Sequence, residues 1–345
     1  MRKIHIISAL FAFVLLGTSC EKAFMEKEPS NDPVTTFEYL WDVVDKQYSF
    51  FDVKGVDWDS VYAVYRPKVS EKISDDSLFN VLGAMLNTLD DGHTNLVSSF
   101  DVSHNEEVYR RMYANKNINT EVVVLNYLTI NYHTTGAFAH NAIRDGQIAY
   151  LRYSSFMDAI ADDDLEYIVN KYKNTKGMII DLRQNGGGSV DNVWNLMKLF
   201  PTGNRQLYQT QIKNGPKHDD FSEMTVMVQP SHDEKTTYRH PIAVLTDRGS
   251  FSATSFFSLC AKSNFQNVTV VGDTTGGGLG LPNGGELPNG WSYRFSITRT
   301  LDMNNNNYEN GMPPDVTEIL DPVQTAQGID NVIEKACDIL LNATK

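Results

Sequence analysis

Two short segments place residues that can carry out hydrolysis at the ends of apolar runs. Residues 249–255, Gly-Ser-Phe-Ser-Ala-Thr-Ser, lie between the apolar run 242–245 and an apolar-periodic stretch that begins at Ala253. Residues 181–188, Asp-Leu-Arg-Gln-Asn-Gly-Gly-Gly, place a glycine run after the apolar run 178–182. A serine on a strand-to-helix turn can be presented as a nucleophile, and a glycine run can turn backbone N–H groups toward an oxyanion. Together the two segments predict a serine hydrolase.

Acyl transfer by serine needs a nucleophile, a base within hydrogen-bond reach and an oxyanion hole. Four hydroxyl residues of the serine turn are candidate nucleophiles: Ser250, Ser252, Thr254 and Ser255. The base must be a neutral histidine or a lysine with a lowered pKa. Local sequence does not identify the nucleophile among the four hydroxyl residues, because a serine before a helix commonly serves as an N-cap.

The order and spacing of three segments resemble the tail-specific, or C-terminal processing, peptidases of family S41. Residues 181–188 resemble their DLRxNGGG segment, residues 249–253 their GSASA serine turn, and residues 270–278 their lvGexTfGKG segment. The resemblance extends from about residue 35 to residue 335. It implies the fold of a ClpP/crotonase-like protease core and the activity of a serine-type endopeptidase.

The resemblance also implies roles for individual residues. Ser252 occupies the nucleophile position of the serine turn. The backbone N–H groups of Gly187 and Ala253 are the expected oxyanion donors. No cofactor and no metal ion is expected, since the remaining histidines show no metal-ligand spacing.

One departure from the family pattern concerns the base. Many members carry a catalytic lysine in GKG, whereas this chain has only glycines at 276–278 and no lysine between Lys262 and Lys335. Lys262 follows Ser252 by ten positions on the same predicted helix. It therefore lies several turns away and is excluded as the base.

The lysine-less branch of the family, which resembles the tricorn core protease, uses a histidine and a glutamate instead. Residues 89–94 resemble its LxDgHt motif and make His93 the candidate base. Residues 309–315 resemble its E-x-G-x-x-P-D segment and make Glu309 the candidate carboxylate that orients the imidazole. In that branch a serine before the histidine completes a tetrad, and here Gly92 stands in its place.

The pattern of apolar runs predicts an α/β (α+β) fold, with a mixed β-sheet and packed helices preceded by a small N-terminal helical bundle. Strands are expected at residues 122–125 and 128–130, and a loop is expected from 274 to 290. The expected divisions are a lipoprotein signal peptide (1–20), a tether (21–34), a helical bundle (35–95), a connecting region (96–145), the peptidase core (146–335) and a C-terminal helix end (336–345).

The connecting region bears on substrate capture. Many relatives carry a PDZ domain of about ninety residues between the bundle and the core, whereas only some fifty residues separate Thr94 from Gln147. A complete PDZ domain does not fit in this interval. Recognition of substrate C-termini by such a domain is therefore not expected.

The N-terminus is predicted to be a targeting segment. A basic start, Arg2 and Lys3, precedes an apolar run from 4 to 16 that is short for a membrane span. Residues 16–20, Leu-Gly-Thr-Ser-Cys, resemble a bacterial lipobox, which implies lipidation of Cys20. The alternative is an ordinary secretory signal. The lipoprotein interpretation predicts a lipid-anchored protein of the cell envelope, on the periplasmic side or surface of a Gram-negative-type outer membrane.

Composition narrows the class of partner. The chain has 345 residues and a formal net charge of −13, which argues against nucleic acid because phosphate binding needs a basic face. The expected partners are peptide or unfolded-protein substrates and, through the anchor, a membrane. Cys260 and Cys337 are either two buried thiols or a disulfide, and the sequence does not distinguish them.

Three functions remain open at this stage. The first is an endopeptidase acting on cell-envelope, dietary or host proteins through Ser252, His93 and Glu309. The second is a catalytically inactive peptide- or ligand-binding lipoprotein on the same scaffold, since a fold does not fix a function. The third is a hydrolase of small esters or amides. The separation of His93 from Ser252 is the observation that discriminates the first from the second.

Overall fold

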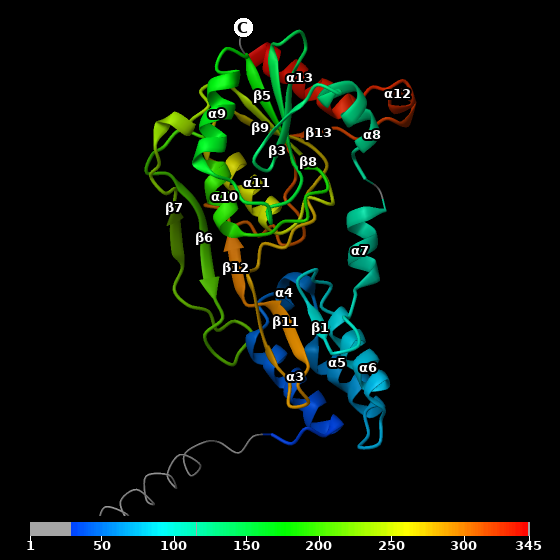
Figure 1. Cartoon of the computed structure of the whole chain (residues 1–345). Helices are drawn as coiled ribbons and strands as arrows, with labels where there is room; N and C mark the ends of the chain where they lie inside the picture. Colours follow the sequence, from blue (N-terminus) through cyan, green and yellow to red (C-terminus); the bar gives the residue numbers. More distant parts are fainter. Residues whose placement is uncertain (1–28, 115, 344–345) are drawn as a thin grey trace, which may run out of the picture.

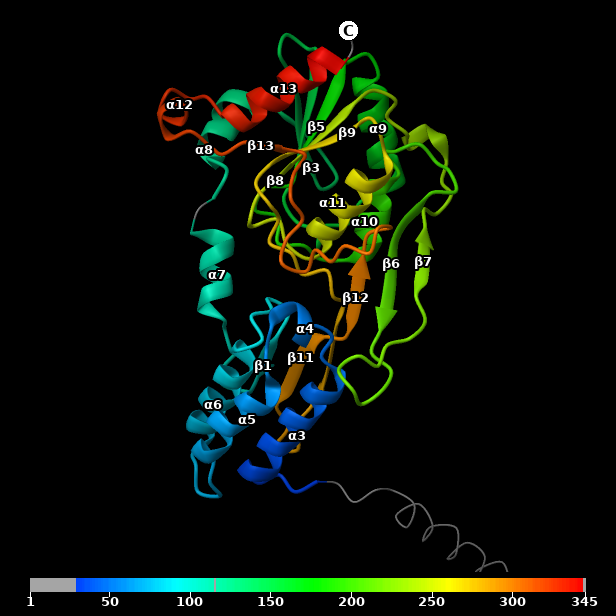
Figure 2. The ribbon, with the colours of Figure 1, turned by 180° about the vertical axis from the view of Figure 1, so that it is seen from behind.

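The computed structural model describes residues 29–114 and 116–343. The predicted signal peptide, Cys20 and residues 21–28 of the predicted tether lie outside the described residues. Two modules are stacked along the long axis of the molecule, and the helix α7 (Glu106–Tyr113) runs between them along one side (Figures 1 and 2).

The larger module, here called the sheet module, is built on a seven-stranded sheet. Its strand order is β13-β9-β8-β5-β4-β3-β2. The first five strands of that order are parallel, and the last two pair antiparallel. The strands are β2 (His133–Thr135), β3 (Phe138–Ile143), β4 (Ile148–Tyr153), β5 (Gly177–Asp181), β8 (Ile242–Thr246), β9 (Val268–Gly272) and β13 (Val316–Thr317).

Helices cover both faces of this sheet, which explains why the central strands are apolar throughout. One face packs against α9 (Asp162–Tyr172), α10 (Val190–Met197) and α11 (Ala253–Asn264). The other packs against α13 (Asn331–Ala343) and a short helical segment before β2. Cys260 and Cys337 are both free and buried, in the cores on these two opposite faces. The two thiols therefore do not form a disulfide.

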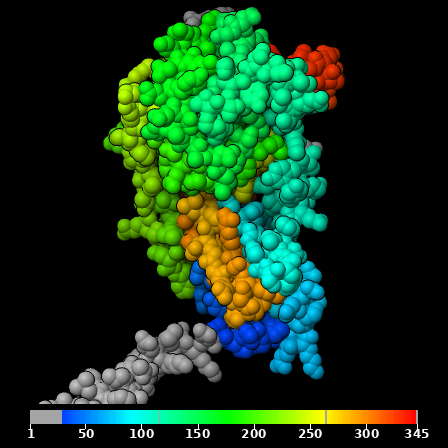
Figure 3. Space-filling model, viewed as in Figure 1, coloured from blue at the N-terminus to red at the C-terminus, as the bar shows by residue number. Residues whose placement is uncertain are grey.

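The smaller module, here called the N-terminal module, contains helices and a three-stranded sheet of order β1-β11-β10. Its helices are α3 (Pro33–Gln47), α4 (Phe51–Lys54), α5 (Trp58–Tyr65) and α6 (Asp75–Asn87), with the 3-10 turn η1 (Arg66–Lys68). Its strands are β1 (Asn95–Val97), β10 (Pro282–Glu286) and β11 (Ser292–Ser296). Helices and strands share one apolar core. A hairpin from the predicted peptidase core thus belongs structurally to the predicted bundle, and Figure 3 shows it lying against the N-terminal helices.

A third sheet of order β12-β6-β7 flanks the two modules. It consists of β6 (Gln206–Ile212), β7 (Thr225–Val228) and β12 (Thr298–Leu301). The remaining short elements are η3 (Glu234–Thr236) and α12 (Pro322–Ala326). None of the helices within the described ranges combines the length and apolar character needed to cross a bilayer.

The strands expected at 122–125 and 128–130 are wrong. The structure has α8 (Thr120–Val122) followed by a π-helical segment, η2 (Val123–Leu128). The Asn119 side chain caps this segment by accepting a hydrogen bond from the Val122 N–H at 3.1 Å. Val123, Tyr127 and Leu128 are buried against the sheet, so tertiary packing overrides the β preference of the valine run.

The loop expected from 274 to 290 contains the strand β10. Its proline and glycine content is not typical of a strand, so the sequence did not predict it. Glycines weaken a strand and usually mark a close approach by another group. Here a Cβ atom at Gly285 would lie 2.5 Å from the hydroxyl oxygen of Tyr293 on the paired strand. A Cβ atom at Gly284 would clash with the backbone oxygen of the same Tyr293, so both glycines mark its close approach.

Candidate active site

The strand-to-helix turn between β8 and α11 presents Ser252 in a strained conformation. Ser252 has φ +56° and ψ −119°, which L residues rarely adopt. Two backbone hydrogen bonds hold the turn: the Phe251 N–H donates to Asn185 O at 3.0 Å, and the Ser252 N–H donates to Gly277 O at 2.9 Å. The serine turn is thus fixed between the two glycine-rich segments.

Ser252 is the one accessible hydroxyl among the four candidates. Ser250, Thr254 and Ser255 are fully buried, and each donates its hydroxyl to a neighbouring oxygen. Ser252 is half-buried. The other three hydroxyls hold the turn together and have no access to a substrate.

His93 comes from the N-terminal module and meets Ser252 at the junction of the two modules. Its Nε2 lies 2.9 Å from Ser252 Oγ. The backbone N–H of His93 donates to Asp91 Oδ1 at 2.8 Å. The imidazole packs against the Phe251 ring, with 4.9 Å between the ring centroids. Burial lowers the pKa of His93 below its ordinary value of 6.5. A neutral imidazole therefore faces the hydroxyl, which is the state required of a base.

Glu309 is buried and makes no hydrogen bond to Ser252 or His93 among the described residues. Its Oε2 accepts from the N–H groups of Leu279 at 2.7 Å and Gly280 at 2.9 Å. Burial raises the pKa of Glu309 to about 8, although these two N–H groups and Lys54 act in the opposite direction.

Asp91 is a second buried carboxylate beside His93 and was not predicted as a site residue. Its Oδ2 and the His93 Nδ1 are both buried and have no hydrogen-bond partner among the described residues. The charge of Asp91 raises the pKa of His93, in opposition to the larger effect of burial. The signal available in the sequence was its place in the same motif, two residues before the histidine.

The glycine run lies against the serine turn, as oxyanion donors require. A Cβ atom at Gly187 would lie 2.7 Å from Phe251 O and 3.0 Å from Ala253 N. Ala253 is the first residue of α11, so its N–H has no partner within the helix. The Gly187 N–H, in contrast, donates to Asn185 Oδ1 at 3.0 Å. The structure brings Gly187 and Ala253 together but leaves the Gly187 donor engaged.

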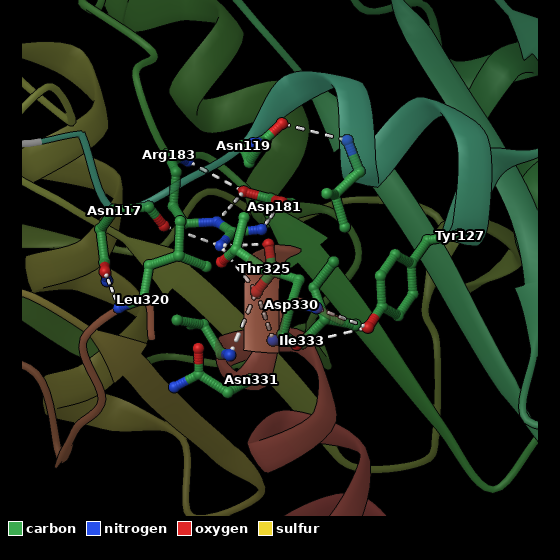
Figure 4. Close-up of polar contacts among 12 residues, drawn as sticks. Asn117, Asn119, Tyr127, Asp181, Arg183, Leu320, Thr325, Asp330, Asn331 and Ile333 are labelled. Atoms are coloured by element: carbon green, nitrogen blue, oxygen red, sulfur yellow. Dashed lines mark hydrogen bonds and ion pairs between the residues drawn. The ribbon is translucent and has the colours of Figure 1, made fainter. Parts of the chain in front are cut away.

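A buried ion-pair network anchors the strand that leads into the glycine run (Figure 4). The Arg183 guanidinium, which is fully buried, pairs with Asp181 at 2.6 Å and with Asp330 at 2.9 Å and donates to Asn117 O at 2.8 Å. Burial disfavours the ionised carboxylate, but Arg183 and Arg152 overcome it and lower the pKa of Asp181 to about 2. The network ties the end of β5 to the start of α13.

Asp247 then joins the glycine segment to the serine turn. Its Oδ1 accepts from the Gln184 N–H at 2.8 Å and from the Gly249 N–H at 3.0 Å. One carboxylate therefore holds the glycine segment and the serine turn together.

Phe251 lines two cavities. The first, of about 310 Å³, is lined by residues of both modules and by Arg111 and Met112 of α7. The second, of about 380 Å³, is lined by residues of α7 and of the segment 102–105. Within the described part of the chain, no cluster of His, Cys, Asp and Glu side chains could hold a metal ion.

Comparison with known proteins gives two family matches and close structural neighbours. Residues 147–318 match peptidase family S41, and residues 29–87 match the tricorn protease C1 domain. A solved structure of a candidate peptidase from Parabacteroides merdae ATCC 43184 is 39% identical, with a TM-score of 0.84, and the alignment covers 90% of this chain and 97% of that one.

Two curated relatives come from Bacillus subtilis (strain 168). The carboxy-terminal processing protease CtpB is 27% identical over 165 residues, which is 48% of this chain and 32% of that protein. The carboxy-terminal processing protease CtpA is 25% identical over 163 residues, which is 47% of this chain and 33% of that protein. The matched region thus spans about a third of the length of either relative.

Proposed function

Because this chain belongs to peptidase family S41, we propose that it is a serine-type endopeptidase in which Ser252 attacks the substrate carbonyl and His93 serves as base and then as acid. The observation that carries the proposal is the 2.9 Å contact between Ser252 Oγ and His93 Nε2. This separation is within the reach that proton transfer needs.

The first step transfers a proton and forms a tetrahedral intermediate. His93 Nε2 accepts the Ser252 proton as Oγ bonds to the carbonyl carbon, and the resulting imidazolium later gives that proton to the leaving amine. The peptide C–N bond then breaks and leaves an acyl-enzyme at Ser252, which water hydrolyses with His93 again as base.

The carbonyl oxygen becomes negative in this intermediate and needs donors. The Ala253 N–H is available at the start of α11. We assign the second donor to Gly187, whose N–H must exchange Asn185 Oδ1 for the oxyanion. The charge-assisted hydrogen bond to an oxyanion is stronger than a neutral one, which favours this exchange in the reacting complex.

We assign the orientation and stabilisation of the imidazolium to Glu309. The carboxylate is held by two backbone N–H groups, so its position is fixed. A positive charge on His93 favours the ionised form of Glu309, in opposition to the effect of burial. The charge of Asp91 also raises the pKa of His93 and so favours the imidazolium.

The experiment that tests the proposal is cleavage of a denatured protein and of a peptide library by the wild type and by Ser252→Ala. We expect the variant to lose at least about 1000-fold in kcat/KM. Ser154→Ala, which removes an exposed hydroxyl in another loop, is the matched control and should match the wild type. Equal activity of Ser252→Ala and the wild type would overturn the assignment. A library that contains ester substrates also separates a peptidase from a hydrolase of small esters.

The alternative function, a non-enzymatic binding protein, is disfavoured by the same contact. A scaffold that only binds ligands has no need for a neutral imidazole against a strained serine. Absence of cleavage in every substrate class, together with tight peptide binding, would restore it.

We further propose that the protein is lipid-anchored in the cell envelope through Cys20 and acts there on peptides or unfolded proteins. The support is the lipobox-like segment 16–20. Incorporation of a labelled fatty acid into the wild type but not into Cys20→Ser is the expected result. Equal labelling of both proteins would contradict the anchor.

A further inference from the structure

Three cationic side chains line the first cavity, which is unusual in a chain with a net charge of −13. They come from separate parts of the fold: Lys54 from α4, Arg111 from α7 and Arg248 from the turn after β8. Phe251, the residue before the proposed nucleophile, forms part of the same wall. This cavity, of about 310 Å³, is called the cation-lined cavity below.

The acidic groups around the cavity leave positive charge unmatched. Asp90 pairs with Arg111 at 2.6 Å, and Asp273 lies 3.7 Å from Arg248. Lys54 Nζ contacts two neutral oxygens instead, the backbone oxygen of Asp90 at 2.8 Å and the side-chain oxygen of Asn310 at 2.6 Å. Glu309 also lines the cavity, but its carboxyl group accepts from the Leu279 and Gly280 N–H groups and forms no ion pair with the three cations among the described residues.

The position of the cavity relates it to one side of the scissile bond. Its wall includes Gly92, which precedes the proposed base, but neither Gly187 nor Ala253, the proposed oxyanion donors. The leaving amine must depart toward His93, because that residue gives it the proton. The cavity therefore lies toward the leaving-group half of the substrate.

We propose that the cation-lined cavity binds a carboxylate of the substrate on the leaving-group side of the cleaved bond. The carboxylate is either the C-terminus of the peptide or an aspartate or glutamate side chain. This inference rests on the proposed peptidase function. Guanidinium groups bind carboxylates through paired hydrogen bonds, and an ammonium group adds a point charge. The cavity would thereby select acidic ends without a PDZ domain.

Binding to the full-length Ser252→Ala protein tests the inference without relying on catalysis. The probes are fluorescent peptides of one neutral sequence, made as the C-terminal acid, as the C-terminal amide, and as an amide with an internal glutamate or glutamine. The acid should bind at least about tenfold more tightly than the amide, or the glutamate peptide more tightly than the glutamine peptide. The pair that discriminates identifies the source of the carboxylate.

Two substitutions then locate the site. Lys54→Gln and Arg111→Gln, each added to Ser252→Ala, should reduce the discrimination toward onefold. Arg110→Gln is the matched control, because Arg110 is the neighbouring residue on α7, is exposed and pairs with Glu107 outside the cavity. It should keep the full ratio.

The outcomes separate this inference from the proposed function. Equal binding within both peptide pairs, absence of any binding, or discrimination that survives both substitutions would overturn the cavity as a carboxylate site. Cleavage of peptides by the wild type would still stand in each of these cases. Conversely, if the peptides are discriminated in binding but none is cleaved, the carboxylate site would stand and the proposed peptidase function would be wrong.

Discussion

Gly187 lies so close to Ser252 that a Cβ atom on the glycine would come within 2.8 Å of the serine Cβ. The glycine also has φ +97°, a conformation that L side chains rarely adopt. The contact packs the glycine run directly onto the serine turn. A side chain at this position would separate the proposed oxyanion donor from the proposed nucleophile.

Gly187→Ala should therefore abolish most activity while leaving the protein folded. We expect kcat/KM to fall by about 100-fold or more, since losing one oxyanion donor costs that much. Gly146→Ala is the matched control, because Gly146 also has a positive φ, of +79°, but nothing lies within 4 Å of an added Cβ. It should share the conformational strain and keep the activity. Similar losses in both variants would contradict the proposed role of the glycine run.

The pH dependence of kcat/KM should report the lowered pKa of His93. The base works only when neutral, so activity rises with pH through the pKa of His93 in the free enzyme. Burial places that pKa below 6.5. Measured from about pH 5 upward, the rise should have its midpoint below 6.5. A midpoint at or above that value would mean that the imidazole is not buried as described.

Glu309 should make the folded state less stable as the pH rises. Its pKa in the folded protein, about 8, is above the ordinary value of 4.5. Between these values the unfolded chain has released the proton that the folded chain retains, so the free energy of unfolding decreases with pH and then levels off.

Glu309→Gln has no titrating carboxyl group at this position, so its free energy of unfolding should not show this decrease with pH. We expect the unfolding midpoint of the variant, measured by urea or thermal unfolding, to rise relative to that of the wild type as the pH is raised from about 5 to about 8. Glu71→Gln, which removes an exposed carboxylate, is the control for a change of surface charge. A constant difference between Glu309→Gln and the wild type at all pH values would contradict the raised pKa.

Arg183→Ala should strongly destabilise the sheet module. The substitution leaves the buried carboxylates of Asp181 and Asp330 without their shared partner, at a cost of about 3–5 kcal/mol in the free energy of unfolding. Arg239→Ala breaks only an exposed pair with Glu234 and should be almost neutral. Urea unfolding distinguishes them. Comparable stability of the two variants would show that the network in Figure 4 is not a stabilising anchor.

Gly92→Ser should reduce activity, even though the lysine-less branch described above has a serine there. An added Cβ would lie 2.8 Å from the Phe251 ring, which packs on the His93 imidazole. Displacing that ring should shift the base and lower kcat/KM by about 10- to 100-fold. An unchanged or higher kcat/KM would show that the site can accept the fourth polar group.

The sequence was sufficient for the family and for the fold class, both of which are confirmed. The serine turn and the glycine run could be found because the local pattern, strand then small residues then helix, is visible in one short segment each. The choice of Ser252 among four hydroxyl residues, and of Gly187 within the glycine run, came from the family resemblance. His93 needed the family resemblance, since it lies 159 positions from Ser252 and on the other module.

Other features depend on long-range packing and left no local signal. The helical segment α8–η2 has a β-favouring composition, and the strand β10 has a β-disfavouring one. Each is determined by what packs against it, the sheet in one case and Tyr293 in the other.

The cation-lined cavity could not be anticipated either. Lys54, Arg111 and Arg248 are scattered along the chain and are brought together only by the stacking of the modules. The hydrogen bond from the Gly187 N–H to Asn185 Oδ1 could not be anticipated either, because it depends on one side-chain rotamer.

The most direct test of the central claim is the site of covalent capture by a fluorophosphonate, which phosphonylates an activated serine hydroxyl. Intact mass and peptide mapping should show one adduct, on Ser252, with none in Ser252→Ala. The rate should fall by about 100-fold in His93→Gln, which removes the base that lies 2.9 Å from Oγ. An adduct on another residue, or equal labelling of Ser252→Ala, would contradict the account.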